Sequence, residues 1–156
     1  EVCLLLDSMQ NTVAGTLPLW LWRVSFTVVL VFVQLFDLGA EVNKTHVWNM
    51  DWHPHARFHV VWQLFSQVSL ASIALLLVWR SVDVRYYRAA VALALVEPTS
   101  YLFSAFLLPL YEGSLVAVPD YDINVFGINI ALVTFIGVEL VLFSLLALAP
   151  PRGKRL

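Results

Sequence analysis

Four long apolar stretches constrain this chain more than any other feature of its sequence. They run from near residue 17 to 39, 58 to 79, 89 to 110 and 125 to 149. Each is long enough to cross about 30 Å of hydrocarbon at about 1.5 Å per helical residue. Lipid offers backbone polar groups no partner, and strands would need a closed barrel, so helices are expected. We therefore predict an all-α, polytopic membrane protein, a four-transmembrane-helix bundle that forms one domain over residues 1–156.

The composition supports the membrane class and excludes several others. Hydrophobic residues make up 60% of the chain and charged residues only 13%, whereas a soluble domain is about 25% charged. The lipid bilayer is therefore an expected partner, and with a net charge of −2 nucleic acid is not. The single cysteine, Cys3, cannot form an internal disulfide. With no P-loop, dinucleotide or haem-attachment motif, we predict no cofactor. The first ten residues, which lack a basic region, do not resemble a signal peptide.

The basic residues predict how the chain is oriented. The link between the second and third stretches carries Arg80, Arg85 and Arg88, and the segment 152–155 carries three more basic residues. The links on the opposite side carry only Lys44 and Arg57. Because basic residues concentrate on the cytoplasmic side, we predict a multi-pass protein with its N- and C-termini in the cytoplasm.

Two carboxyl groups occupy the middle of apolar stretches, Glu97 in the third and Glu139 in the fourth. Ionisable groups at such depth are costly and usually face the interior of a bundle. Pro98 follows Glu97 directly and is expected to kink the third helix, with the hydroxyl of Ser100 nearby. This combination predicts a hydrated pocket, although a protonated carboxyl bonded to a neighbouring helix would also explain each glutamate.

A stripe of polar residues marks one face of the second stretch. His55, His59, Gln63 and Gln67 recur at intervals of four, which places them along one side of a helix. Asp37 in the first stretch and Asn129 in the fourth belong to the same predicted side of the membrane. We therefore predict a polar cleft that opens to the outer side, with Glu97 near its floor.

The four histidines all fall between residues 46 and 59. A zinc site at His55 and His59, completed by His53 or Asp51, remains an alternative. Pro54 offers a simpler explanation, because a helix beginning there would carry the histidines at its outer end. We predict no metal site.

The segment Trp48-Asn49-x-x-Trp52-x-Pro54-His55-Ala56-Arg57-Phe58-His59 resembles the signature of a group of small four-span membrane proteins of unassigned function. That signature is roughly aromatic-Asn-Pro-x-Trp-Pro-Pro-His-Ala-Lys/Arg-Phe-His, and Met50 and His53 stand where the group often has proline. The resemblance implies the four-span layout and no activity. In topology alone, the chain is similar to the sterol-isomerase and sigma-2 receptor superfamily, whose members enclose a lipophilic ligand among four helices. No motif carries their functional residues onto this sequence.

These features favour a protein that binds or converts a lipophilic small molecule by acid–base chemistry, as an isomerase or cyclase does. Glu97, His59 and Asp37 are the candidate catalytic residues. The candidate ligand-binding residues are His55, Gln63, Gln67, Asn129, Glu139 and Ser100. Two alternatives stay open, a non-catalytic assembly subunit of a membrane complex and a proton-coupled transporter acting as a homo-oligomer.

Overall fold

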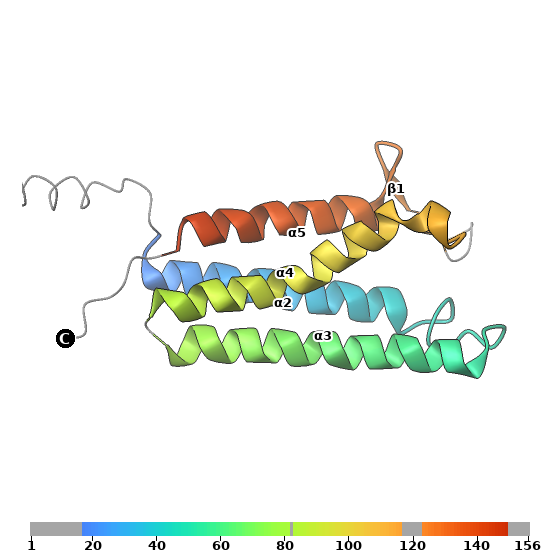
Figure 1. Cartoon of the computed structure of the whole chain (residues 1–156), viewed down its shortest axis with the longest axis horizontal. Coiled ribbons are helices and arrows are strands. Elements are labelled where there is room, and N and C mark those ends of the chain that lie inside the picture. Colours follow the sequence, from blue (N-terminus) through green and yellow to red (C-terminus); the bar gives the residue numbers. More distant parts are fainter. Residues whose placement is uncertain (1–16, 82, 117–122, 150–156) are drawn as a thin grey trace, which may run out of the picture.

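Four long helices make up most of this computed structural model, which describes residues 17–81, 83–116 and 123–149. They are α2 (Leu19–Glu41), α3 (Pro54–Arg80), α4 (Val84–Phe106) and α5 (Ile130–Ala147) (Figure 1). Each is long and apolar enough to cross a membrane. The predicted four-helix membrane fold is therefore confirmed, and the chain has the architecture of a multi-pass membrane protein.

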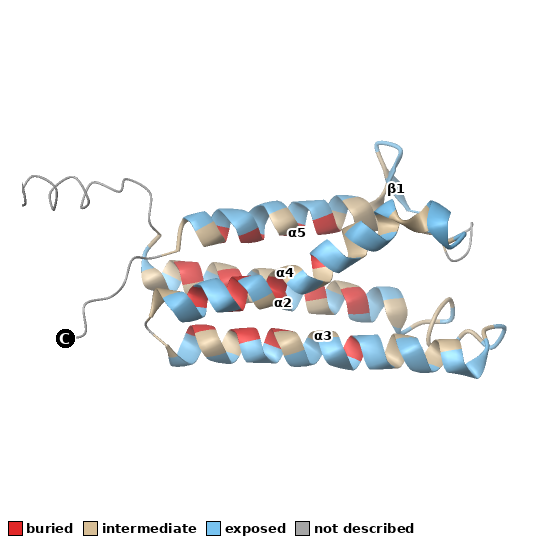
Figure 2. Cartoon of the chain, in the orientation of Figure 1, coloured by how far each residue is buried: buried red, intermediate tan, exposed pale blue. Residues whose placement is uncertain are grey.

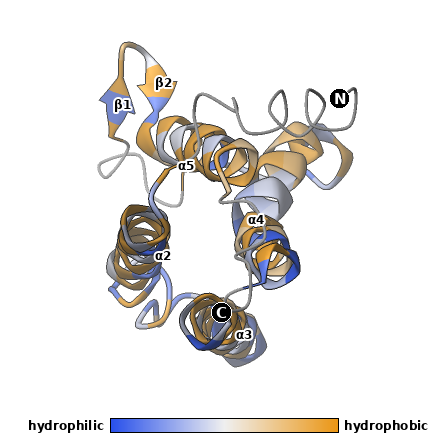
Figure 3. Ribbon diagram, turned by 90° about the vertical axis from the view of Figure 1, so that its left-hand side faces the viewer, coloured by the Kyte–Doolittle hydropathy of each residue, from blue (hydrophilic) through white to orange (hydrophobic). Residues whose placement is uncertain are grey.

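The helices follow one another around the bundle. α3 packs against α2 and α4, and α5 packs against α4 and closes the ring on α2 (Figure 3). Consecutive helices alternate in direction (Figure 1). The link between α3 and α4 therefore lies at one end of the bundle, and the other two links lie together at the opposite end.

Each of the last three helices begins at a residue whose side chain caps it. His53 Nδ1 accepts a hydrogen bond from the amide of His55 at 3.2 Å, and Pro54 occupies the first helical position. Asp83 and Asn129 accept equivalent bonds at the starts of α4 and α5. These bonds satisfy amides that have no partner within the helix. The caps explain why α3 begins at Pro54 and α4 at Val84, both earlier than the apolar stretches indicate.

A small hairpin delays the start of α5. Strands β1 (Asn124–Val125) and β2 (Ile128–Asn129) pair antiparallel. Phe126 and Gly127 form the turn, with φ values of 53° and 79°, which suits a two-residue hairpin. The fourth helix consequently begins at Ile130 and not near Val125.

Most of the fully buried side chains lie in the half of the bundle nearest the α3–α4 link. Trp22 is fully buried between the rings of Phe26 and Tyr87, whose centroids lie 5.3 and 5.1 Å away. Its indole Nε1 donates a hydrogen bond to the carbonyl of Leu145 at 2.7 Å, which joins α2 to α5. Figure 2 shows buried residues on the inward faces and exposed ones outward. Large apolar side chains such as Phe65, which is 71% exposed, cover the outer faces, as a lipid environment requires.

Arg23 lies at the same end of the bundle as this packing. Its guanidinium donates to the carbonyl of Ser81 and to the hydroxyl of Tyr87, and it lies 5.7 Å from the ring centroid of Trp79. α2 is thereby tied to the α3–α4 link. Which side of the membrane this end faces stays a prediction. The basic segment 152–155, on which the predicted orientation depends, lies outside the described residues, and so does Cys3.

Candidate functional site

A cavity of about 640 Å³ occupies the half of the bundle away from the α3–α4 link. Its walls come from the second half of α2, the first half of α3, the second half of α4 and the start of α5. His46, from the link between α2 and α3, also borders it. The segment that follows α4 and begins with the 3-10 turn Leu108–Leu110 also lines the cavity at this end, through Leu108, Tyr111, Ser114 and Leu115. The cavity is large enough for a drug-sized ligand.

Glu97 occupies the deep end of this cavity and is tied to α2. Its Oε2 accepts a hydrogen bond from Gln34 Nε2 at 3.0 Å. Below Glu97 and Gln67 the packing closes to a void of about 10 Å³. Pro98, which is fully buried, lacks the amide that would continue the helical bonding of α4. Figure 1 shows α4 leaving the neighbourhood of α3 and approaching α5 over its second half. The space for the cavity opens where the two helices diverge.

Three polar oxygens in the lining have no hydrogen-bond partner among the described residues. They are Oε1 of Glu97, Oε1 of Gln67 and Oδ2 of Asp37. Asp37 is only 7% exposed. A buried oxygen without a donor costs about 1–3 kcal/mol, and such groups in a native structure normally have a partner. All three are acceptors, so the cavity is suited to a group that donates hydrogen bonds.

The lining also includes aromatic rings and carboxyl groups, beside aliphatic side chains, serine hydroxyls and the imidazole of His46. Phe36, Tyr101 and Phe135 line the cavity on α2, α4 and α5, and the rings of Tyr101 and Phe135 stack at 4.3 Å. Asp37, Glu41 and Glu97 contribute carboxyl groups. Among the described lining residues there is no lysine or arginine. This lining accommodates apolar surface and disfavours a negatively charged ligand.

Five of the candidate residues predicted from the sequence border this cavity: Asp37, Gln63, Gln67, Glu97 and Ser100. They come from α2, α3 and α4. Glu97, Gln67 and Asp37 are also the three residues with unpartnered oxygens.

His55 and His59 lie outside the cavity lining. Their Nε2 atoms are 3.0 Å apart on the exposed first turns of α3, and the ring of His55 stacks on Phe58 at 6.0 Å. Within the described ranges, no third histidine, cysteine, aspartate or glutamate joins them in a group that could hold a metal ion. The polar stripe of α3 therefore divides, with its histidines at the helix end and its glutamines in the cavity.

Glu139 and Asn129 make structural contacts. Glu139 Oε1 accepts a hydrogen bond from Thr99 Oγ1 at 2.6 Å, which links α5 to α4. Asn129 Oδ1 accepts from the amide of Ala131 at 3.0 Å and so caps α5. Neither side chain is part of the cavity lining.

The structure adds residues that the sequence did not single out as site residues. Gln34 is the hydrogen-bond donor to Glu97, and Tyr101 and His46 line the cavity. The spacing offered a signal for two of them. Tyr101 follows Glu97 by four residues and Gln34 precedes Asp37 by three, which places each pair on one helix face. His46 lies on a link, where no periodicity indicates its direction.

Comparisons with known proteins define the family of this chain and assign no activity. No curated protein and no solved structure matches it. The likeness to the sterol-isomerase superfamily therefore stays a prediction, as does the link to proteins with the Trp48–His59 signature. One family covers most of the chain, including all the helices that border the cavity except the first residues of α2. The chain belongs to this family of unknown function, DUF6640, which matches residues 23–148.

Proposed function

We propose that this protein binds a lipophilic small molecule in the cavity bordered by α2, α3, α4 and α5. One observation carries the proposal. A cavity of about 640 Å³ with aromatic walls contains three acceptor oxygens that have no partner among the described residues. Binding pockets for small molecules are typically apolar, with a few polar groups that fix the orientation of the ligand.

The position of Glu97 makes it the central polar contact of the bound molecule. Gln34 holds one of its carboxyl oxygens, and the other is left without a donor. A ligand donor that bonds to this oxygen would remove the cost of leaving it unpaired. The same carboxyl group can donate or accept a proton, as can Asp37 in the same lining. For a ligand that the protein converts, we therefore propose a proton-transfer reaction such as isomerisation.

The test is native mass spectrometry of the detergent-purified protein, with the wild type beside Glu97→Gln. We expect the wild type to retain a lipophilic molecule. The glutamine variant should bind this molecule at least about tenfold more weakly and so retain less of it, because a hydrogen bond to a charged group contributes about 1.5–3 kcal/mol and 1.4 kcal/mol is a factor of ten in affinity.

Glu139→Gln is the matched control. It makes the same chemical change in another membrane helix, at a residue outside the cavity lining. It should retain the ligand as the wild type does. Equal occupancy in all three proteins would refute the role of Glu97. A wild type that carries no lipophilic molecule but co-purifies with other polypeptides would instead support the assembly-subunit alternative.

A further inference from the structure

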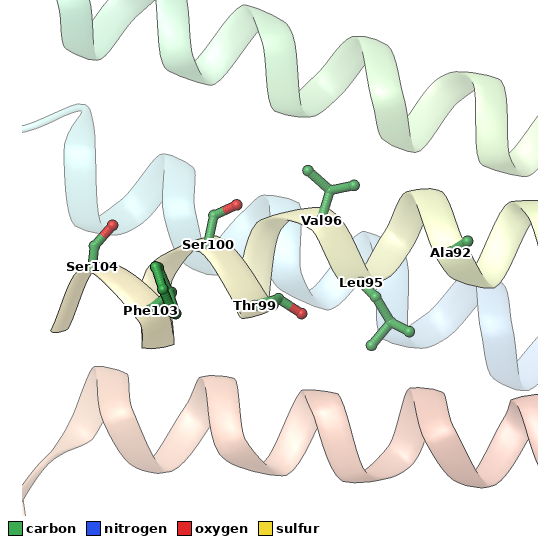
Figure 4. A pocket seen from close by; sticks show the side chains of 7 residues that line it. All are labelled: Ala92, Leu95, Val96, Thr99, Ser100, Phe103 and Ser104. Carbon is green, nitrogen blue, oxygen red and sulfur yellow. The ribbon is translucent and has the colours of Figure 1, made fainter. Parts of the chain in front are cut away.

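The cavity has an opening on the side of the bundle, between α3 and α4. Two helices contribute side chains that line the cavity and are also exposed on the outside of the bundle. They are Gln63 and Ser66 of α3, and Val96, Ser100 and Ser104 of α4. Figure 4 shows these three α4 side chains on the edge of the helix that faces α3. Val96 lies about 18 Å along α4 from Val84, at about 1.5 Å per residue. This is within the depth of the hydrocarbon core, so the opening faces lipid.

An open groove on the outer side of α4 adjoins the opening. It measures about 610 Å³ and shares Val96, Ser100 and Ser104 with the cavity. Its other residues include Ala92, Leu95 and Phe103, so most of its surface is apolar (Figure 4). Cavity and groove therefore form one continuous surface, polar inside the bundle and apolar outside it.

The cavity and the groove differ in chemistry, and together they match a ligand with a polar head and an apolar chain. The inner part has unpartnered oxygens on Asp37, Gln67 and Glu97, and Asp37 is more than nine-tenths buried. Acceptor oxygens require a donor, and carboxyl groups without a nearby lysine or arginine repel an anion. The outer part offers contacts for hydrocarbon.

Resting on the proposed function, we infer that the ligand is a long-chain amphiphile taken from the plane of the bilayer. Its head group donates hydrogen bonds and carries no negative charge, as in a long-chain alcohol or amine. The head group occupies the cavity at Asp37, Gln67 and Glu97. The hydrocarbon chain passes between α3 and α4 and lies on the groove of α4.

Photolabelling tests this inference with the full chain in phosphatidylcholine liposomes. The probes are hexadecanol, hexadecylamine and hexadecanoic acid, each with a diazirine at the same carbon of the chain. We expect the alcohol, the amine or both to label the α4 segment 92–103, and excess unmodified hexadecanol or hexadecylamine to compete. The relative labelling tells a hydroxyl head group from an ammonium. The acid, an anion at neutral pH, should label this segment at least fivefold less.

Val96→Trp narrows the opening and should lower labelling at least fivefold. Leu140→Trp is the matched control, because Leu140 is 64% exposed on α5 and borders neither the cavity nor the groove. Labelling by the acid equal to that by the other probes would overturn the inference, as would full labelling of Val96→Trp. If the purified protein carries a lipophilic molecule but none of the probes labels α4, the inference fails while the proposed function stands.

Discussion

Replacement of Trp22 by phenylalanine should destabilise the bundle, chiefly because it removes a single hydrogen bond. The last carbonyls of a helix have no partner within it, and Leu145 lies in the last turn of α5. The neighbouring Ser144 carbonyl accepts the amide of Leu148. The carbonyl of Leu145 accepts from the Trp22 indole at 2.7 Å. Trp22→Phe keeps an aromatic ring against Phe26 and removes this donor.

The expected loss can be worked out from two contributions. A buried carbonyl left without a donor costs about 1–3 kcal/mol. The smaller ring also leaves unfilled volume at a residue that is 0% exposed, which adds about 1 kcal/mol. Together they lower the free energy of unfolding by about 2–4 kcal/mol, a large part of a typical stability.

The assay is unfolding in mixed micelles by titration with sodium dodecyl sulfate, followed by near-ultraviolet circular dichroism. Trp62→Phe is the control, because Trp62 is 59% exposed on the outer face of α3, and it should change the free energy by less than about 0.5 kcal/mol. If Trp22→Phe also changes the free energy of unfolding by less than about 0.5 kcal/mol, the indole bond does not stabilise the contact between α2 and α5.

Two further substitutions probe the cavity. Gln34→Leu removes the donor to Glu97 Oε2, so the free energy of unfolding in the same assay should fall by about 1–3 kcal/mol. An unchanged value would mean that the carboxyl group finds another donor. Pro98→Ala lets α4 regain a backbone bond and straighten, which should narrow the opening toward α3 and lower alcohol or amine photolabelling at least fivefold. Full labelling would show that the opening does not depend on the proline.

The fold class could be predicted because the membrane places a local demand on each segment. A stretch such as residues 58–79 must satisfy its backbone internally wherever its neighbours lie, so its helical state follows from composition and length. The helix boundaries were less predictable. The proline itself predicted that a helix begins at Pro54, as α3 does, whereas α5 begins only after the cap at Asn129, which follows a hairpin that hydropathy does not register.

Residues of the candidate site could be predicted from the sequence only where their position on one helix face placed them in the cavity. Gln63 and Gln67 share a face of α3, and both line the cavity. The same periodicity also included His55 and His59, which lie at the end of α3 outside it. Spacing along a helix fixes direction around the axis, but it does not say how far along the axis a cavity extends.

The sequence by itself determined that this chain forms four apolar helices with carboxyl groups at membrane depth. Only the tertiary structure decided which carboxyl group faces the cavity. Glu97 borders it beside Gln34, whereas Glu139 bonds to Thr99 between α4 and α5. The physical reason is that hydropathy and periodicity act within one helix. The rotation of each helix, and the divergence of α4 from α3, depend on side-chain packing between segments far apart in the chain.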